Sequence, residues 1–319
     1  MRLLADRRAY RFLTTPTVVI LLSCVIIWGV AQLAFPGFAS FGHIRYMLEL
    51  SAILGIVAGG QTVVVLTGGI DLSVGAMITF AAILGPSITL LVGDSGIVSV
   101  PLLLLITAAI GGVNGLAVSA LRIHPMIMTL AMATILTGVM LLASGGTAVA
   151  VHSPVVVWLA NAHFAGVSIS ILVWLLVAVL LILLLRRTVL GVWIYAIGTS
   201  QRASELSAVN ERLVHVAAYS ISGFTAGLTG VLLSGVTMQG SIGIGDPYLL
   251  MSIAAVVVGG TSILGGQGGY GGTIAGSILL TTLTSLITVV NLSAGGRSML
   301  LGLLVLGLLG LYARESRRA

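Results

Sequence analysis

Residues 247–296 read PYLLMSIAAVVVGGTSILGGQGGYGGTIAGSILLTTLTSLITVVNLSAGG, and none of these side chains is charged at neutral pH. A helix needs about 20 apolar residues to cross the hydrocarbon core of a membrane. The run is therefore long enough for two spanning helices. A glycine cluster, Gly265–Gly272, interrupts it at a point where the chain is too flexible to favour a helix.

The rest of the chain has the same character. Its 319 residues are 58% hydrophobic and only 7% charged, and the mean hydropathy is +1.20. A soluble domain carries roughly 25% charged residues. The composition predicts an all-α, polytopic membrane protein in which residues 1–319 form a single transmembrane domain.

Hydropathy divides the chain into about ten spanning helices. The predicted spans are 17–35, 46–67, 74–92, 99–121, 127–145, 168–186, 214–236, 248–264, 273–291 and 298–313. The first is also open to interpretation as a cleavable signal peptide, because Arg7 and Arg8 precede it. Its apolar stretch is long for that purpose, since a signal core has about 7–15 residues.

The distribution of arginine predicts the orientation, because cytoplasmic loops attract basic residues. With the N-terminus inside, twelve arginines are cytoplasmic: Arg2, Arg7, Arg8, Arg11, Arg122, Arg186, Arg187, Arg202, Arg212, Arg314, Arg317 and Arg318. Only Arg45 and Arg297 are then outside. We therefore expect a multi-pass protein of the inner (plasma) membrane with both termini in the cytoplasm and 145–167 outside.

The chain contains no lysine, and that absence excludes several chemistries. A phosphate-binding P-loop needs its lysine, so this chain is not predicted to hydrolyse ATP. The sequence shows no metal-ligand cluster and no nucleophile–base arrangement, so we expect no catalytic residue, no metal and no bound cofactor. The single Cys24 lies in an apolar segment and is predicted to be a packing residue.

Two glycine-rich breaks interrupt the predicted helices. The run from Gly266 to Gly271 satisfies the G-x-G-x-x-G string of dinucleotide-binding folds, but it interrupts membrane helices and has no acidic residue at the required distance. The other break is 67–73, with the sequence TGGIDLS. Both fall at predicted cytoplasmic helix ends. They are either plain turns or joints that let the cytoplasmic mouth change shape, since unpaired backbone cannot face lipid.

Asp71 is an acid close to the hydrocarbon and is costly there unless it has a function or a partner. It either carries protons or caps and locks the break, since a helix begins near Ser73. We favour the second role, and we group Asp71 and Ser73 with the pathway and gating candidates. The amides of Gln61, Asn114 and Asn291 lie within predicted spans and are candidates for lining the pathway. Amides and hydroxyls with almost no fixed charge suit a neutral, polyhydroxylated solute.

Glycines also recur at four-residue spacing. The pairs are Gly55/Gly59, Gly111/Gly115, Gly223/Gly227 and Gly272/Gly276. We expect them to allow close approach between helices.

The segment at about 198–213 is the most polar cytoplasmic stretch, and we predict that it couples the protein to a partner. Ser200 is placed to cap a short helix, and Asn210 to close it. Ala203, Leu206 and Val209 fall near one face of that helix. The alternative is that it lies idle on the membrane surface. The predicted coupling residues are Gly198, Arg202, Ala203, Glu205, Leu206, Ala208 and Asn210.

Three strings together resemble the signatures of permease subunits of ribose-type ABC importers. They are TGGIDLSVG at 67–75, YAIGT at 195–199 with 203–210 after it, and IAAVVVGGTSILGG at 253–266. They occur in the expected order and cover most of the chain. The residues before Ile253 depart from the pattern: many relatives have an acidic residue there, and this chain has YLLMS at 248–252.

The resemblance implies an ABC importer permease fold and a pathway formed with a second permease copy, as a homodimer or a related heterodimer. It also implies a cytoplasmic ATPase that holds ATP and Mg, and an extracytoplasmic sugar-binding protein. Membrane lipid surrounds such a subunit, and no nucleic acid is involved. The substrate expected is a neutral monosaccharide or related polyol, although the sequence does not name it. Two alternatives stay open: a proton-coupled secondary transporter using Asp71, and a permease of the more distant branched-chain amino-acid type.

Overall fold

The computed structural model describes residues 16–290, 295–296, 299–300, 302–303 and 307. Its helices are α2 (Pro16–Ala34), α3 (Phe41–Leu66), α4 (Val74–Val92), α5 (Ser99–Ala120), α6 (Pro125–Ser144), α7 (Pro154–Asn161), α8 (Ile169–Arg187), α9 (Val189–Thr199), α10 (Gln201–Leu206), α11 (Glu211–Thr237), α12 (Asp246–Val258) and α13 (Tyr270–Val289). Two small antiparallel ribbons complete the described part, β1 (Val149–Ala150) with β4 (Gln239–Gly240) and β2 (His163–Phe164) with β3 (Val167–Ser168). The prediction of an all-α, polytopic membrane protein is confirmed.

Eight helices in the described residues are long and apolar enough to cross a membrane. The predicted span 248–264 is too long, because α12 ends at Val258. The reason is that Gly260 adopts a positive φ of 86° and turns the chain away. The prediction also missed α9, an 11-residue helix inside the expected cytoplasmic loop. The last predicted span, 298–313, lies largely outside the described residues.

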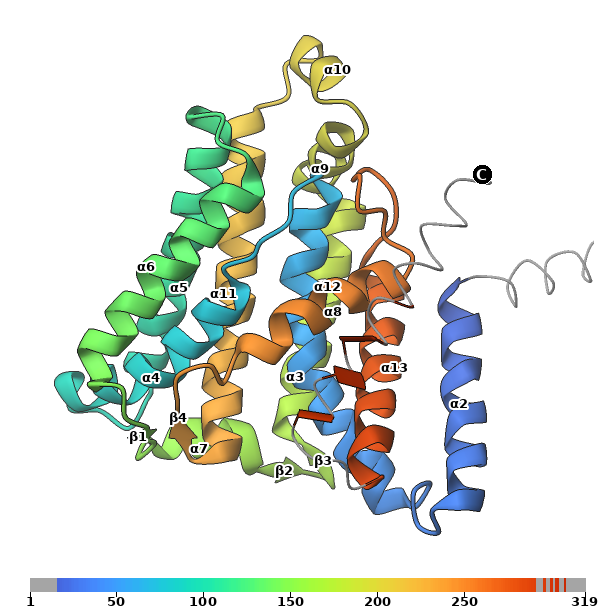
Figure 1. The fold of residues 1–319 in the computed structure, drawn as a ribbon. Helices are drawn as coiled ribbons and strands as arrows, with labels where there is room; N and C mark the ends of the chain where they lie inside the picture. The colour runs from blue at the N-terminus through green and yellow to red at the C-terminus, as the bar shows by residue number, and fades with distance from the viewer. Residues whose placement is uncertain (1–15, 291–294, 297–298, 301, 304–306, 308–319) are drawn as a thin grey trace, which may run out of the picture.

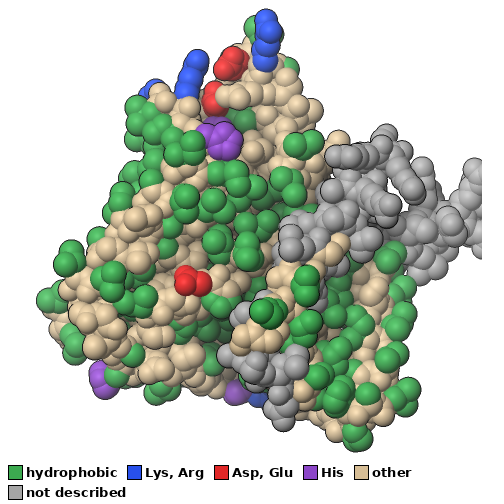
Figure 2. Space-filling view, viewed as in Figure 1, with side chains coloured by type: hydrophobic (Ala, Val, Ile, Leu, Met, Phe, Trp, Pro, Cys, Tyr) green, Lys and Arg blue, Asp and Glu red, His purple; other side chains and the backbone are tan. Residues whose placement is uncertain are grey.

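Two long segments connect the spanning helices, 145–168 between α6 and α8 and 188–210 between α8 and α11. They lie at opposite ends of the molecule (Figure 1). Helix α10 caps one end, whereas α7 and the four short strands lie at the other. Five of the described arginines lie at the α10 end: Arg122, Arg186, Arg187, Arg202 and Arg212. Arg45 lies at the opposite end, near the start of α3. In Figure 2 most of the charged side chains in view lie around the α10 end, while the flank below it is largely apolar with one acidic side chain, and a basic side chain is visible at the opposite end. This charge separation is what a membrane-spanning bundle requires.

The closest helix contacts depend on glycine, as predicted. A side-chain carbon on Gly111 or Gly115 of α5 would overlap the backbone of α11 at Tyr219 or His215. One on Gly223 would overlap Thr107 on α5 in return. Small residues let membrane helices approach to backbone contact, where dispersion replaces the hydrophobic effect. The prediction of close approach is confirmed for these two pairs and for Gly272/Gly276, which faces the backbone at the end of α12, whereas Gly55/Gly59 faces side chains.

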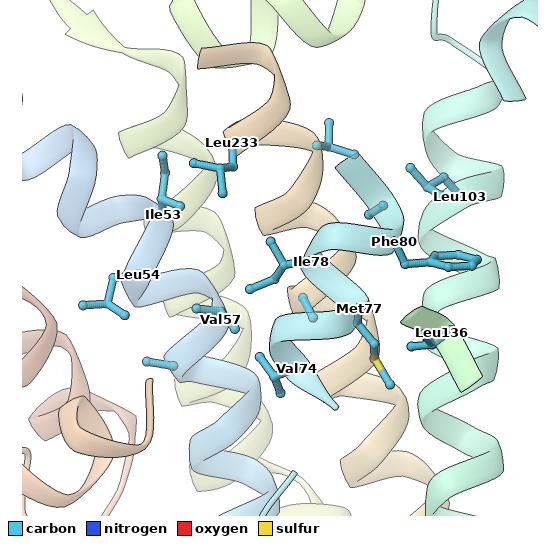
Figure 3. Close-up of a cluster of buried hydrophobic side chains, with 14 of the residues drawn as sticks. Ile53, Leu54, Val57, Val74, Met77, Ile78, Phe80, Leu103, Leu136 and Leu233 are labelled. Carbon is cyan, nitrogen blue, oxygen red and sulfur yellow. The ribbon is translucent and has the colours of Figure 1, made fainter. Parts of the chain in front are cut away.

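The main apolar cluster joins α3, α4, α5, α6 and α11 (Figure 3). It includes Val57 on α3, Ile78 on α4 and Leu233 on α11. Helix α2 packs separately on α13, where Cys24 lies buried in a cluster with Ala275. This confirms the expected packing role of Cys24, and it gives the first predicted span a place in the bundle.

Candidate functional site

Helices α9 and α10 form a hairpin that projects from the arginine-rich end. Thr188 caps α9, since its hydroxyl accepts a hydrogen bond from the Gly191 N–H at 3.1 Å. Ser200 caps α10 as predicted, and its Oγ lies 3.3 Å from the Ala203 nitrogen. We use the name coupling hairpin for residues 189–210, because they overlap the segment 198–213 that the sequence predicts to couple the protein to a partner.

The apolar side chains of α9 and of α10 differ in burial: Ile194 and Ile197 on α9 are buried in the second apolar cluster, whereas those of α10 are left uncovered. Leu206 is 86% exposed, and Ala203 and Ala208 are exposed beside it. Val209 is partly buried against the second apolar cluster, so it does not share the open face that the sequence predicted. Arg202 is exposed as well. Leu206, Ala203 and Ala208 therefore form an exposed apolar face that no other described element covers.

Asn210 does not close α10, contrary to the prediction. Its Oδ1 accepts from the Leu213 N–H at 3.0 Å and thereby caps α11. The end of α10 is formed instead by Ala208, whose φ of 56° lies in the left-handed region. The Val209 N–H then reaches back to the Ser204 carbonyl at 3.1 Å. This turn usually carries glycine, so a residue with a side chain is strained there.

Asp71 lies at the centre of a fully buried polar cluster. Its Oδ1 accepts from the backbone N–H of Ser73 at 2.9 Å and from the Ser73 hydroxyl at 2.5 Å. Its Oδ2 accepts from the Ser222 hydroxyl on α11 at 2.7 Å. Asn114 of α5 donates to the Ser73 hydroxyl at 3.1 Å. One carboxylate oxygen therefore bonds within the α3–α4 break, and the other fixes the break to α11. Asn114 links the break to α5 through the Ser73 hydroxyl.

The sequence predicted that the 67–73 break lies at a helix end, but in the structure it extends further into the bundle. The Leu72 N–H donates to the Thr129 hydroxyl on α6 at 3.0 Å. Asn114 lies six residues before the end of α5 at Ala120, and at 1.5 Å per residue this is about 9 Å inside the bundle. The segment 67–73 thus runs inward from the tip of α3. Protein packs around its backbone, as irregular structure at membrane depth requires.

The other pathway candidates have different surroundings. Gln61 is fully buried, and the described residues offer no partner to its amide oxygen or nitrogen. Its neighbours one turn away, Val57 and Val65, belong to the cluster that includes Val74 of α4. Asn291 lies outside the described residues.

The Asp71 cluster also contains two unused polar atoms. The Oδ1 of Asn114 and the hydroxyl of Tyr219 are buried without a partner among the described residues. Sequence reasoning missed Ser222, Thr129 and Tyr219. Their distance along the chain from Asp71 gives no local signal. No group of three His, Cys, Asp or Glu side chains among the described residues is arranged to hold a metal ion.

At the end opposite α10, Asp94 stabilises the start of α5. Its Oδ2 accepts from the Val98 N–H at 2.6 Å and from the Ser99 N–H at 3.2 Å. These hydrogen bonds, mainly the one from Val98, hold the pKa of the Asp94 carboxyl below its ordinary value. Arg45 and His163 both lie close to Glu49 at this end, at 3.2 and 3.3 Å.

The described residues thus form a membrane-spanning bundle packed through glycine, with a buried polar break and an exposed hairpin at one end. The chain belongs to the family described as branched-chain amino acid transport system / permease component, which matches residues 43–311.

Several curated proteins are similar over most of their length. The ribose import permease protein RbsC of Escherichia coli strain K12 is 30% identical, over 86% of each chain. The fructose import permease protein FruF of Bifidobacterium longum is 32% identical, over 79% of this chain and 72% of its own. The Escherichia coli inner membrane ABC transporter permease protein YjfF is 36% identical, over 76% and 74%. No solved structure matches.

Proposed function

We propose that this chain forms part of the pathway by which an ATP-driven importer moves a neutral monosaccharide or related polyol across the inner membrane. The observation that carries the proposal is the exposed coupling hairpin at the arginine-rich end of a chain that belongs to the permease family. A second copy of the chain, or a related permease, completes the pathway. This chain breaks no bond, and ATP and Mg bind to a separate ATPase.

The ATPase docks on α10. Burying one leucine is worth about 1.5–3 kcal/mol, whereas an exposed ion pair contributes about 0–1 kcal/mol. Leu206 and Ala203 therefore supply most of the contact energy, and Arg202 and Glu205 set the register at its margin. An ATPase on α10 requires α10 to face the cytoplasm, and we propose that both chain termini lie on that side as well.

The opposite end receives the extracytoplasmic binding protein. This end of the permease presents α7 and the ribbons on either side of α7. The Arg45, Glu49 and His163 side chains lie at its surface. Loaded binding protein and ATP must favour different states of the permease, because a ligand shifts an equilibrium only through its differential affinity for the two states.

A sugar is favoured over an amino acid as the solute. Two of the relatives carry the names of sugar importers, for ribose and fructose. Within the described residues, no arginine is buried in the bundle to bind an amino-acid carboxylate. The polar groups in its interior are mostly amides and hydroxyls, as in Gln61, Asn114 and Ser222. Such groups match the hydroxyls of a neutral solute.

The test is reconstitution of the chain with a Walker-motif ATPase and the binding protein in vesicles. We expect ATP-dependent uptake of a labelled monosaccharide and none of labelled leucine. Leucine uptake, or uptake driven by a proton gradient without ATP, would contradict the proposal.

A separate substitution tests the docking role of α10. Ala203→Trp adds a bulky side chain to an exposed helix, so it leaves folding intact but blocks seating of the ATPase. Stimulated ATP hydrolysis and uptake should fall together. Ala120→Trp is the matched control, since Ala120 is exposed at the same end of the molecule but outside the hairpin. Full activity of the Ala203→Trp complex would show that α10 is not the docking element.

A further inference from the structure

Three segments that are far apart in the sequence meet by their backbones at the base of the coupling hairpin. The N–H of Gly266 donates to the carbonyl of Leu66 at 3.0 Å. Gly198 lies directly against both, and a side-chain carbon on it would overlap the Leu66 oxygen and the Gly266 nitrogen. We refer to these three residues as the backbone junction.

Glycine is required on more than one side of this junction. Gly265 and Gly266 have φ values of 89° and 70°, in the region that other residues adopt only under strain. A side-chain carbon on Gly265 would lie 2.8 Å from the Gly68 nitrogen and 3.0 Å from the Gly198 Cα. The neighbours are backbone atoms, which cannot rotate away as a flexible side chain does.

Each member of the junction lies in a different segment of the chain. Gly198 lies in the last turn of α9, two residues before the Ser200 cap of α10. Leu66 ends α3 and leads directly into the buried break that contains Asp71. Gly266 lies in the connection between α12, which ends at Val258, and α13. In Figure 1 the ends of α9 and α3 approach each other beneath α10.

A second tie connects the same two parts. The Tyr195 hydroxyl on α9 donates to the Gly268 carbonyl at 2.9 Å. Helix α9 therefore holds the α12–α13 connection at two points, once by backbone packing and once by a side chain.

We propose that the backbone junction of Leu66, Gly198 and Gly266 transmits movement of the coupling hairpin to both helix breaks, so that Gly198 is a positioning residue for transport. The proposal rests on the proposed function, since it takes α10 as the element that the ATPase moves. Packed backbones shift as a unit, because a well-packed contact deforms in discrete steps and not continuously. A displacement of α9 then moves the α3–α4 break and the α12–α13 connection together.

The experiment compares Gly198→Ala, Tyr195→Phe and a control in the reconstituted complex. The control is Gly271→Ala, because a side-chain carbon on Gly271 has nothing within 4 Å although it lies in the same glycine-rich segment. The quantity measured is the number of sugar molecules imported per ATP hydrolysed. This ratio reports transmission, and a general loss of folded protein does not change it.

Gly198→Ala should still bind the ATPase, because the exposed face of α10 is unaltered. Its transport per ATP should fall about tenfold, within the range of typical coupling between sites. Tyr195→Phe should lower the ratio about twofold to fivefold, and Gly271→Ala should leave it unchanged. A wild-type ratio in Gly198→Ala would overturn the proposal. If that variant does not fold, the milder Tyr195→Phe decides, and an unchanged ratio there has the same consequence. Failure of the proposed function is distinct, because the wild-type chain would then show no ATP-driven uptake.

Discussion

Replacing Asp71 separates a structural role from a role that needs charge. In Asp71→Leu three donors lose their acceptor: the Ser73 N–H, the Ser73 hydroxyl and the Ser222 hydroxyl. A buried donor left unsatisfied costs about 1–3 kcal/mol. Hydrogen bonds between membrane helices average only about 0.6 kcal/mol, because polar groups of the unfolded chain in the membrane also find partners. We therefore expect Asp71→Leu to lose about 2–4 kcal/mol of unfolding free energy.

Asp71→Asn should behave differently. Its amide oxygen keeps both bonds from Ser73, and its amide nitrogen donates to the Ser222 oxygen. The variant also removes the cost of burying a charge. We expect its unfolding free energy to lie within about 1 kcal/mol of wild type, and its ATP-driven uptake to be substantially retained.

The assay is denaturant titration of the purified protein in mixed micelles, with uptake measured in vesicles. Ser222→Ala should cost about 0.5–1 kcal/mol, since it removes a single donor. Ser277→Ala is its control, because within the described part of the chain that buried hydroxyl bonds only to the Thr273 carbonyl, one turn earlier in its own helix. If Asp71→Asn were as stable as wild type yet transported nothing, the structural account would be refuted. The carboxylate would then have a charge-dependent role, such as carrying a proton.

Three further predictions concern the two ends of the molecule. Leu206→Cys should resist an impermeant thiol reagent in intact cells whereas His163→Cys reacts, and the reverse pattern would invert the topology; native Cys24 is buried and gives little background. Ala208→Gly should raise stability by about 1 kcal/mol, because glycine adopts the left-handed conformation freely, and a lower melting temperature would contradict this. Asp94 should stabilise the protein at neutral pH, because its pKa is lower in the folded state than the ordinary value of 3.8. This contribution is lost as the pH falls from 3.8 through the folded-state pKa. Asp94→Asn should therefore make the unfolding free energy less dependent on pH in this acid range.

The membrane character and most of the helices follow from the sequence, because a spanning helix satisfies its own backbone and needs only an apolar run. The span 74–92 coincides with α4, and the predicted limits of α5 and α8 differ from the observed ones by one residue. Ser200 was identifiable as a cap because capping acts over three residues. Helix α9 was missed because an 11-residue apolar segment has no distinct signal beside the longer spans.

What surrounds Asp71 was decided only by tertiary structure. The sequence shows a costly buried acid and two glycine-rich breaks. The Ser222 hydroxyl on α11, which donates to that acid, is 151 residues away along the chain. The same holds for the junction of Leu66, Gly198 and Gly266. The sequence shows its glycines but does not indicate which distant segments pack against them. Periodicity and capping are local properties that a sequence records directly. Hydrogen bonds and backbone contacts between distant segments depend on how the helices pack, and they exist only in the folded bundle.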